Sequence, residues 1–326
     1  MTQLKRIGVL TSGGDGPGLN ACIRAATRTA ISLGLDVMGI ARGYTGLIHG
    51  EFTPFDARSV GGIMGKGGTV LGTTRLPEFK EKKYQREAIR VLNQHHVDGL
   101  IVIGGNGSLS GALALHEMGF PTVGIPGTID NDIGGTDMAV GVDTALNTVL
   151  DAIDKIKDTA SSHQRAFLIE VMGRDCGYLA LMSGIAGGAE SILIPEIPTP
   201  VADVAQALTD AYVKGKTHGI VIVAEGYKPG TQAVIEYLEE HKDELGFSMR
   251  VTVLGHVQRG GAPSAFDRIL GTRLGVAAAK GLVNGKSGHI AGLIGNQVRL
   301  TPLKTALEDT YRIDDHLHEL AHIMEI

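Results

Sequence analysis

The chain has 326 residues, of which 43% are hydrophobic and 20% charged, so it is too apolar to be disordered and long enough for two packed domains. Its formal net charge of −5 argues against nucleic acid or an anionic membrane as the main partner, because both reward a strongly basic surface. Glycine accounts for 47 residues, roughly twice the usual share of about 7%, and shows no three-residue period, which excludes collagen. The excess predicts sharp turns and close approach of the backbone to a ligand.

Short runs rich in Val and Ile predict strands over residues 6–10, 37–40, 99–103, 122–125, 166–171, 191–194, 219–224 and 250–254. These runs are apolar on both faces, which is typical of buried parallel strands. Between them, apolar residues at helical spacing predict crossover helices over 146–156 and 201–212. The alternation predicts a doubly wound α/β architecture, in which ligands bind beyond the carboxyl ends of the strands.

Four glycine-containing loops follow predicted strands: TSGGDGPG at 11–18, GGNGS at 104–108, PGTIDND at 126–132 and MGRDCG at 172–177. In the first two, backbone N–H groups could converge on a phosphate beside a helix N-terminus, although the glycines could also serve only as tight turns. A further glycine run at 65–72, followed by Arg75, favours polyphosphate binding. The GKS at 285–287 lacks the preceding glycine of a P-loop, so a P-loop enzyme is not expected.

The TIDND sequence places Asp130 and Asp132 two residues apart, so both carboxylates would project to one side of an extended loop. One could accept a hydroxyl proton while the other faces a metal-bound phosphate, as phosphoryl transfer requires. An Asx turn with solvated carboxylates is the alternative. Cationic partners for phosphate oxygens stand near strand ends, although any one of them could be an ordinary surface residue: Arg75, Arg165, Arg174, Arg250, His256 and Arg259.

A competing motif near the end of the chain, His318 to His322, matches the H-E-x-x-H pattern of zinc hydrolases. No third ligand is apparent in the sequence, so a polar helix face is the favoured interpretation. Cys22 and Cys176 are expected to be small buried packing residues rather than nucleophiles. The chain shows neither a signal peptide nor an apolar run of about 20 residues, which predicts a cytoplasmic protein.

Seven motifs occur in one order along the chain: GGDGPGLN, GGTVLGTTRLPEF, GGNGS, PGTIDND, SSHQR, MGRDCG and VLGHVQRGG. By these motifs the chain resembles bacterial ATP-dependent 6-phosphofructokinases over nearly its whole length. The resemblance implies two Rossmann-like domains with mainly parallel sheets, a large ATP-binding domain at 1–141 and 258–308 and a small fructose-6-phosphate-binding domain at 142–257 and 309–326. It also implies transfer of the γ-phosphoryl group of ATP to the C1 hydroxyl of fructose 6-phosphate in glycolysis, with Mg²⁺, by a homotetramer whose active sites lie across subunit contacts.

The resemblance assigns residue roles. Asp130 looks like the base, and the rest of the catalytic set would be Thr128, Arg75, Arg174 and Asp132. ATP would be bound by Gly14, Tyr44, Arg75, Leu76, Gly105, Asn106, Gly107 and Ser108, and Mg²⁺ by Asn106 and Asp132. The sugar phosphate would contact Thr128, Asp130, Asp132, Arg165, Met172, Gly173, Arg174, Glu225, Arg250, His256 and Arg259, of which Arg165 and Arg250 resemble a pair lent by a neighbouring subunit. ADP or phosphoenolpyruvate would act at Arg24, Arg28, Arg58, Lys157, Glu190, Lys214 and Lys216.

Some positions bear on specificity or depart from the family pattern. Pyrophosphate-using relatives carry Asp and Lys where this chain has Gly107 and Gly127, which favours ATP as the donor. Asn106 replaces the usual acidic residue, which keeps an oxygen ligand but removes a negative charge near Mg²⁺. A catalytically weakened nucleotide- or sugar-phosphate-binding paralogue is therefore the alternative function. Effector control is expected to be altered or weak, because the family pattern is changed at Ala57, Arg58, Lys157 and Lys214.

Overall fold

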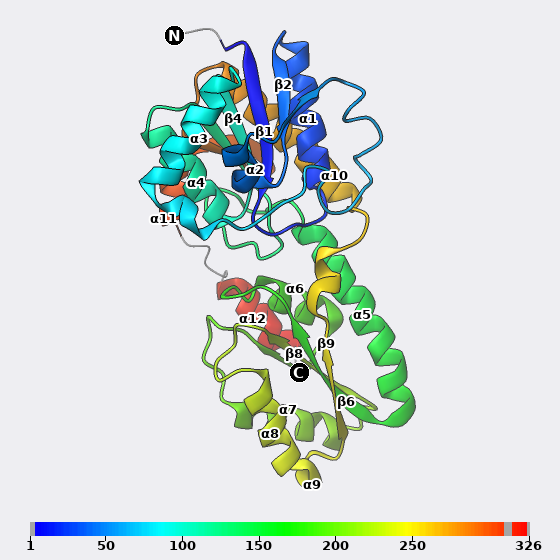
Figure 1. The fold of residues 1–326 in the computed structure, drawn as a ribbon. Helices are drawn as coiled ribbons and strands as arrows, with labels where there is room; N and C mark the ends of the chain where they lie inside the picture. The colour runs from blue at the N-terminus through cyan, green and yellow to red at the C-terminus, as the bar shows by residue number, and fades with distance from the viewer. Residues whose placement is uncertain (1–3, 310–314, 325–326) are drawn as a thin grey trace. The chain divides into compact units, whose positions relative to one another are not determined.

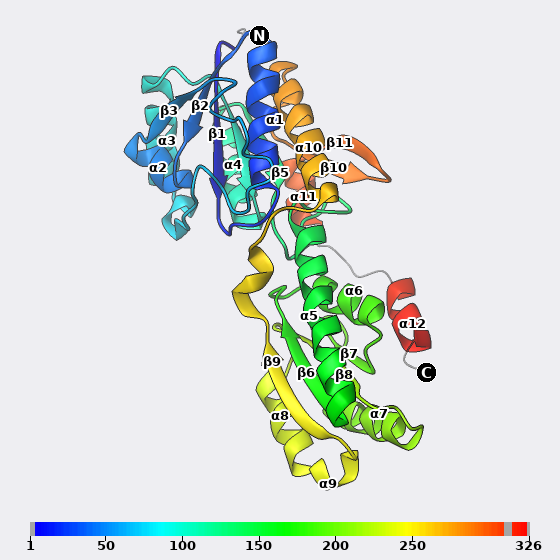
Figure 2. The same ribbon diagram turned by 90° about the vertical axis from the view of Figure 1, so that its right-hand side faces the viewer.

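A computed structural model describes residues 4–309 and 315–324. The chain divides into two compact units, unit 1 (Met1–Thr144 and Arg259–Tyr311) and unit 2 (Ala145–Gln258 and Arg312–Ile326). Each unit contains one β-sheet with helices on both faces (Figures 1 and 2). The α/β class predicted from the alternation of apolar runs and helical patterns is confirmed.

The sheet of unit 1 has seven strands in the order β11-β10-β5-β4-β1-β2-β3. Its parallel centre consists of β1 (Arg6–Ser12), β2 (Asp36–Ile40), β4 (Gly99–Gly104), β5 (Thr122–Pro126) and β10 (His289–Ile294). The two edge strands, β3 (Phe52–Phe55) and β11 (Gln297–Pro302), run antiparallel to their neighbours. The strands predicted in this part of the chain are present. The strands β3, β10 and β11 were not predicted, although Gly295 and Asn296, both with positive φ, mark the hairpin between the last two.

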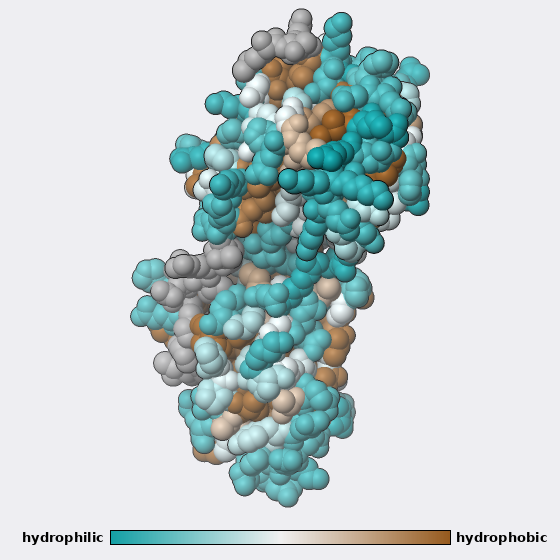
Figure 3. All heavy atoms as spheres, turned by 60° about the vertical axis from the view of Figure 1, so that its left-hand side comes forward, coloured by the Kyte–Doolittle hydropathy of each residue, from teal (hydrophilic) through white to brown (hydrophobic). Residues whose placement is uncertain are grey.

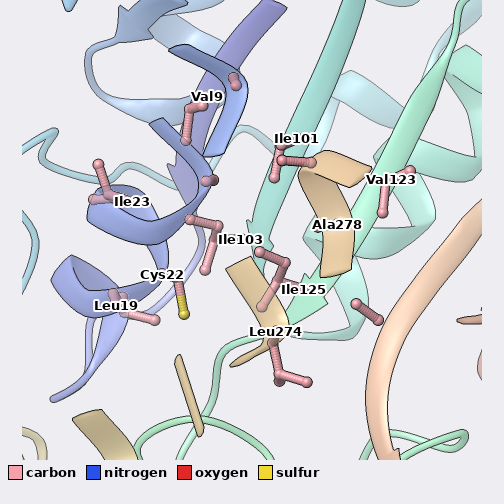
Figure 4. Packing of buried hydrophobic residues seen from close by; sticks show 14 of the residues in the cluster. Val9, Leu19, Cys22, Ile23, Ile101, Ile103, Val123, Ile125, Leu274 and Ala278 are labelled. Atoms are coloured by element: carbon pink, nitrogen blue, oxygen red, sulfur yellow. The ribbon is translucent and has the colours of Figure 1, made fainter. Parts of the chain in front are cut away.

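Helices cover both faces of this sheet. One face holds α1 (Leu19–Ser32) and α10 (Ala265–Val283), which lie side by side in Figures 1 and 2. The other face holds α2 (Gly43–His49), η1 (Pro77–Lys80), α3 (Lys82–Gln94), α4 (Asn106–Glu117) and α11 (Leu303–Glu308). Each face carries a hydrophobic core. Figure 4 shows the core on the first face, in which side chains of α1 and α10 meet those of the central strands.

The contact between α1 and α10 explains part of the glycine excess. A Cβ on Gly275 would lie 2.7 Å from the carbonyl oxygen of Cys22, so only glycine lets the two helices approach this closely. Cys22 is fully buried there, and burial raises the pKa of its thiol far above the usual range. Cys176 is also buried. The predicted burial of both cysteines is confirmed.

The sheet of unit 2 has four parallel strands in the order β7-β8-β6-β9, namely β6 (Arg165–Val171), β7 (Ser191–Leu193), β8 (Gly219–Ala224) and β9 (Ser248–Val253). One face packs against α7 (Val201–Val213), α8 (Thr231–Glu240) and α9 (Lys242–Leu245). The other face packs against α5 (Val142–His163), α6 (Tyr178–Gly187) and α12 (Asp315–Met324). The four predicted strands are present, and the two predicted crossover helices lie in α5 and α7.

Two further observations concern the surface and the last helix. None of the helices in residues 4–309 and 315–324 is both long enough and apolar enough to cross a membrane. The face drawn in Figure 3 is mostly hydrophilic, with hydrophobic residues in separate small patches. The H-E-x-x-H motif falls in α12, but the side chains of His318 and His322 lie outside the described residues, so the favoured polar helix face and the rival zinc site both stay predictions.

Candidate active site

Three loops of unit 1 start side by side at the carboxyl edge of its sheet. β2 lies on one side of β1 and β4 on the other, so the order of strands reverses at β1. The register pairs Ser12 with Gly104, and Gly104 with Pro126, so the chain leaves these three strands at one level (Figure 1). Ligands of doubly wound sheets bind at such a switch point, which makes this edge the candidate site.

The glycine turn after β1 leads into α1. Gly13 and Gly18 have φ of 90° and 94°, values that glycine adopts without strain. Gly18, the N-cap of α1, has no side chain that could cap the first N–H groups of the helix. The guanidinium of Arg259 packs on this turn, because Nη1 of Arg259 overlaps the position that a Cβ on Gly14 would take. The turn therefore combines backbone donors with a cation, both of which favour phosphate.

The segment that carries Arg75 and Leu76 is hydrogen-bonded to the same turn. Gly13 donates its N–H to the carbonyl of Thr74 at 3.3 Å, and the hydroxyl of Thr73 donates to the carbonyl of Gly13 at 2.9 Å. Arg75 itself is exposed and follows directly after this pair of contacts. The two segments thus bring Gly14 and Arg75 to one place.

The second glycine turn opens α4. Its N-cap, Gly105, makes no side-chain cap hydrogen bond within the residues described. Nδ2 of Asn106 donates to Oδ2 of Asp132 at 2.9 Å and to the backbone carbonyl of Asp132 at 3.2 Å. A Cβ on Gly107 would meet no atom of residues 4–309 or 315–324 within 4 Å, so a side chain at this position would project into open space at the helix N-terminus.

Tyr44 packs against this second turn. Its hydroxyl donates to the carbonyl of Ser108 at 2.6 Å, and its ring stacks on Phe79 with centroids 3.9 Å apart. The side chain is only 4% exposed, and burial raises the pKa of its hydroxyl, so it remains a donor at all physiological pH values. Tyr44 therefore lies next to the predicted nucleotide loop as a buried contact of that loop.

The loop after β5 is not extended as predicted. Asn131 has a φ of 54°, so the chain turns between the two aspartates and the alternation of an extended strand does not apply. The side chain of Asn131 is buried, accepts a hydrogen bond from the N–H of Ala139 at 2.9 Å and donates to the carbonyl of Asp137 at 3.2 Å. As a result the two carboxylates have different environments: Asp130 is 2% exposed, whereas Asp132 is partly exposed and bonded to Asn106.

Asn106 and Asp132 are suited to hold a magnesium ion. Both offer oxygen ligands and they are in direct contact, and Mg²⁺ is usually held by one or two protein groups together with substrate phosphates and water. Within residues 4–309 and 315–324 no group of three or more His, Cys, Asp or Glu side chains could hold a metal by itself. The donor set thus fits an ion that arrives with its phosphate ligand.

In unit 2 a second group of predicted residues meets at the carboxyl edge of the sheet. The N–H of Met172 donates to Oε1 of Gln258 at 3.1 Å. The N–H groups of Gly173 and Arg174 donate to Oε1 of Glu225 at 3.2 and 2.7 Å. These contacts join the loop after β6 to the ends of β8 and β9, where Glu225 and the 3₁₀ helix η2 (Gly255–Arg259), which contains His256, are found. Gln258 was not predicted as a site residue; in the sequence it is marked by its place inside the VLGHVQRGG motif.

Arg165 and Arg250 lie elsewhere in unit 2. Arg165 is the first residue of β6, and Arg250 of β9 pairs with Phe167, two residues further along β6. Met172 follows the other end of the same strand, roughly 23 Å from Arg165 at about 3.3 Å per residue. The structure therefore does not bring this arginine pair together with Met172, Gly173, Arg174 and Glu225 of the same chain.

The predicted effector residues form one group in each unit. In unit 2, Nζ of Lys216 is 3.4 Å from Oε1 of buried Glu190, and Nζ of Lys157 lies 3.5 Å from the position of a Cβ on Gly188. Lys214 is exposed at the end of α7. In unit 1, Arg24 and Arg28 lie on α1, and Arg28 donates to the carbonyl of Ala57 at 3.3 Å, next to exposed Arg58.

Comparison with known proteins identifies the family. A family model described as phosphofructokinase matches residues 6–282. The ATP-dependent 6-phosphofructokinase of Thermotoga neapolitana is 50% identical over 322 residues, which is 98% of this chain and 100% of that protein. The enzyme of the same name from Natranaerobius thermophilus is 51% identical over 323 residues, 99% of this chain and 100% of that protein. The chain belongs to the phosphofructokinase family.

Solved structures agree with this assignment. A phosphofructokinase from Saccharomyces cerevisiae superimposes with a TM-score of 0.86 at 35% identity, covering 99% of this chain and 48% of that longer chain. A pyrophosphate-dependent phosphofructokinase from Marinobacter aquaeolei, at 21% identity, has the same fold with a TM-score of 0.83 over 96% of this chain and 86% of that chain. The phosphofructokinase fold predicted from the motifs is confirmed.

Proposed function

We propose that the protein transfers the γ-phosphoryl group of ATP to the C1 hydroxyl of D-fructose 6-phosphate, giving fructose 1,6-bisphosphate and ADP. The observation that carries this function is the meeting of two glycine turns and the buried carboxylate of Asp130 at one sheet edge. It agrees with the activity named for relatives that are about half identical over their full length. The alternative, a paralogue that has lost efficient chemistry, is not favoured.

The residues of unit 1 suit in-line phosphoryl transfer. Asp130 would take the proton of the C1 hydroxyl as that oxygen bonds to the γ-phosphorus and the bond to the ADP oxygen breaks. The amides of the two glycine turns and the guanidinium of Arg75 would stabilise the negative charge on the phosphoryl oxygens. Thr128 accepts a hydrogen bond from the N–H of Asp130 at 3.1 Å and so orders the backbone beneath the base. Mg²⁺ bound by Asn106 and Asp132 would neutralise charge on the phosphates.

The residues of unit 2 suit recognition of the sugar phosphate. The N–H groups of Met172, Gly173 and Arg174 already donate to Gln258 and Glu225, so they are not available to a phosphate. We infer that the 6-phosphate is bound by the side chain of His256 instead. Unit 1 would then be the ATP-binding domain and unit 2 the sugar-phosphate domain.

We also infer that Arg165 and Arg250 serve the sugar site of a neighbouring subunit in a homotetramer. Arg165 begins β6 and Arg250 of β9 pairs with Phe167, so they lie roughly 23 and 17 Å from Met172 of their own chain at about 3.3 Å per residue. Asp130→Asn and Arg165→Ala chains should each be nearly inactive, but their mixed tetramers should recover activity. In such hybrids some sites combine an intact Asp130 from one chain with an intact Arg165 from the other. The measurement is turnover after co-expression or refolding of the two variants.

The matched control for this experiment is a mixture of Asp130→Asn and Arg75→Ala chains. Asp130 and Arg75 belong to the same unit, so every site of that hybrid lacks one of them and no recovery is expected. Equal behaviour of the two mixtures would show that Arg165 acts within its own chain.

The contact between Asn106 and Asp132 leads to a prediction about the Mg²⁺ requirement. Asn106→Asp would place two carboxylates in contact, which repel each other without an ion but bind Mg²⁺ more strongly. We expect the Mg²⁺ concentration for half-maximal turnover to fall by roughly tenfold, and the melting temperature without Mg²⁺ to fall as well. Asn284→Asp, at the exposed C-terminal end of α10, is the control and should leave the Mg²⁺ requirement unchanged. An unchanged Mg²⁺ requirement in Asn106→Asp would remove this pair from the metal site.

The function as a whole is tested by one matrix of assays: turnover with ATP or pyrophosphate, each with and without ADP and phosphoenolpyruvate. We expect turnover with ATP and weak responses to both effectors, because Lys157 and Lys214 offer point charges where the family pattern has forked arginines. We propose the cytoplasm as the location, as expected of a glycolytic kinase.

A further inference from the structure

We propose that Gln258 is a positioning residue for the sugar phosphate, which holds the loop after β6 and the turn Gly255–Arg259 in one arrangement. The proposal rests on the proposed function, because it concerns the substrate side of the same reaction. Gln258 lies in η2 between His256 and Arg259, and none of its surface is exposed. A residue without exposed surface does not contact the substrate, so its effect must pass through the groups that it binds.

Both ends of the Gln258 amide are hydrogen-bonded. Oε1 accepts from the N–H of Met172 at 3.1 Å, and Nε2 donates to the carbonyl of Gly255 at 2.9 Å. The first bond ties η2 to the start of the loop after β6, and the second closes the turn in which His256 lies. One side chain thereby fixes the segment that begins with Met172 and the segment that presents His256.

Gln258 and Glu225 together bind three successive backbone N–H groups. Glu225, directly after β8, accepts from the N–H groups of Gly173 and Arg174, so three successive N–H groups are held by side chains that follow the two strands flanking β6. Gly173 and Arg174 have φ of 145° and 53°. A positive φ is energetically costly for a residue other than glycine, so these hydrogen bonds are needed to hold the backbone at Arg174 in this conformation. The side chain of Arg174 leaves the loop from this fixed backbone.

The chemistry of the site explains why an amide stands at position 258. Met172 presents a donor and Gly255 an acceptor, and a neutral amide satisfies both at once. A buried carboxylate could accept from Met172 but would lose the bond to Gly255 or would have to be protonated. It would also place a negative charge beside His256, which is proposed to bind the 6-phosphate. A leucine of similar size would fill the space but leave both backbone groups unpaired.

The test compares Gln258→Leu and Gln258→Glu with Gln206→Glu, an exposed glutamine on α7 of the same unit. We expect Gln258→Leu to raise the KM for fructose 6-phosphate on the order of tenfold, with kcat and the KM for ATP changed less than about twofold. Hydrogen exchange of the Met172 amide should quicken in the leucine variant and stay slow in the glutamate variant, which keeps the acceptor. Gln206→Glu should behave as the unmodified protein.

Two outcomes would overturn the proposal: a KM for fructose 6-phosphate that is unchanged in both variants, or equal rises in the two KM values. If Gln258→Leu does not fold, Gln258→Glu tests the proposal instead. It should raise the KM for fructose 6-phosphate selectively, because it loses the hydrogen bond to Gly255. The exchange of the Met172 amide is measured without turnover. A protein that fails to phosphorylate fructose 6-phosphate would therefore disprove the proposed function, whereas unaltered exchange in Gln258→Leu would disprove the role of Gln258.

Discussion

Replacing Asp130 by asparagine is expected to lower kcat by on the order of 10²–10⁴-fold, because the substitution removes the group that accepts the hydroxyl proton while keeping its shape. Asp130 is 2% exposed, so bulk water has little access to take over the role of base. The KM for ATP should change little, since the glycine turns are left intact. Steady-state turnover in a coupled assay measures the effect, and calorimetry confirms that ATP still binds.

The control for this substitution is Asp137→Asn in the same loop. Asp137 is exposed, and its carboxylate accepts a hydrogen bond from the N–H of Gly295 at 2.7 Å, a bond that an asparagine oxygen can also accept. Turnover of this variant should stay within about twofold of that of the unmodified protein. Substantial turnover in Asp130→Asn at unchanged pH dependence would assign the base to another group.

Replacing Gly107 by aspartate is expected to lower kcat/KM for ATP by on the order of 10²-fold, because juxtaposed negative charges cost several kcal/mol. A side chain here enters open space at the N-terminus of α4, the region assigned to the phosphates of ATP. The fold should not suffer, because an acidic residue in the first turn of a helix interacts favourably with the helix dipole. The measurements are kcat/KM for ATP and for pyrophosphate, together with the melting temperature.

Gly107→Asn, of similar size but neutral, separates charge from bulk and should lose less activity with ATP. Gly127→Ala provides the contrast at the second position linked to donor choice. Its Cβ would lie 2.6 Å from Cδ2 of Leu19 and 3.2 Å from Cγ2 of Ile103, so it should destabilise the fold by about 1–3 kcal/mol without changing donor preference. Undiminished kcat/KM for ATP in Gly107→Asp would show that position 107 does not face the donor.

Much of the fold was predictable because it depends on local patterns. Buried parallel strands need apolar residues on both faces, and the runs that include Val9, Ile101 and Ile222 carry that pattern in the sequence. The strand Phe52–Phe55 was missed because it lies at an exposed edge and contains Pro54, so its pattern is weak. The loop around Asn131 was predicted wrongly because its course depends on hydrogen bonds to Ala139 and Asp137, which no local pattern reveals.

The sequence by itself determined the α/β class, the order of most strands along the chain, the loops that follow them, and, through its motifs, the family. The tertiary structure decided which of these loops meet: it placed the turns after β1, β4 and β5 at one edge, and Arg165 and Arg250 at the far end of β6 from Met172. It also revealed Gln258 and the contact of Asn106 with Asp132. The physical reason is that helices and strands follow from short-range periodicity, whereas a site depends on hydrogen bonds between residues that only strand order and register bring together.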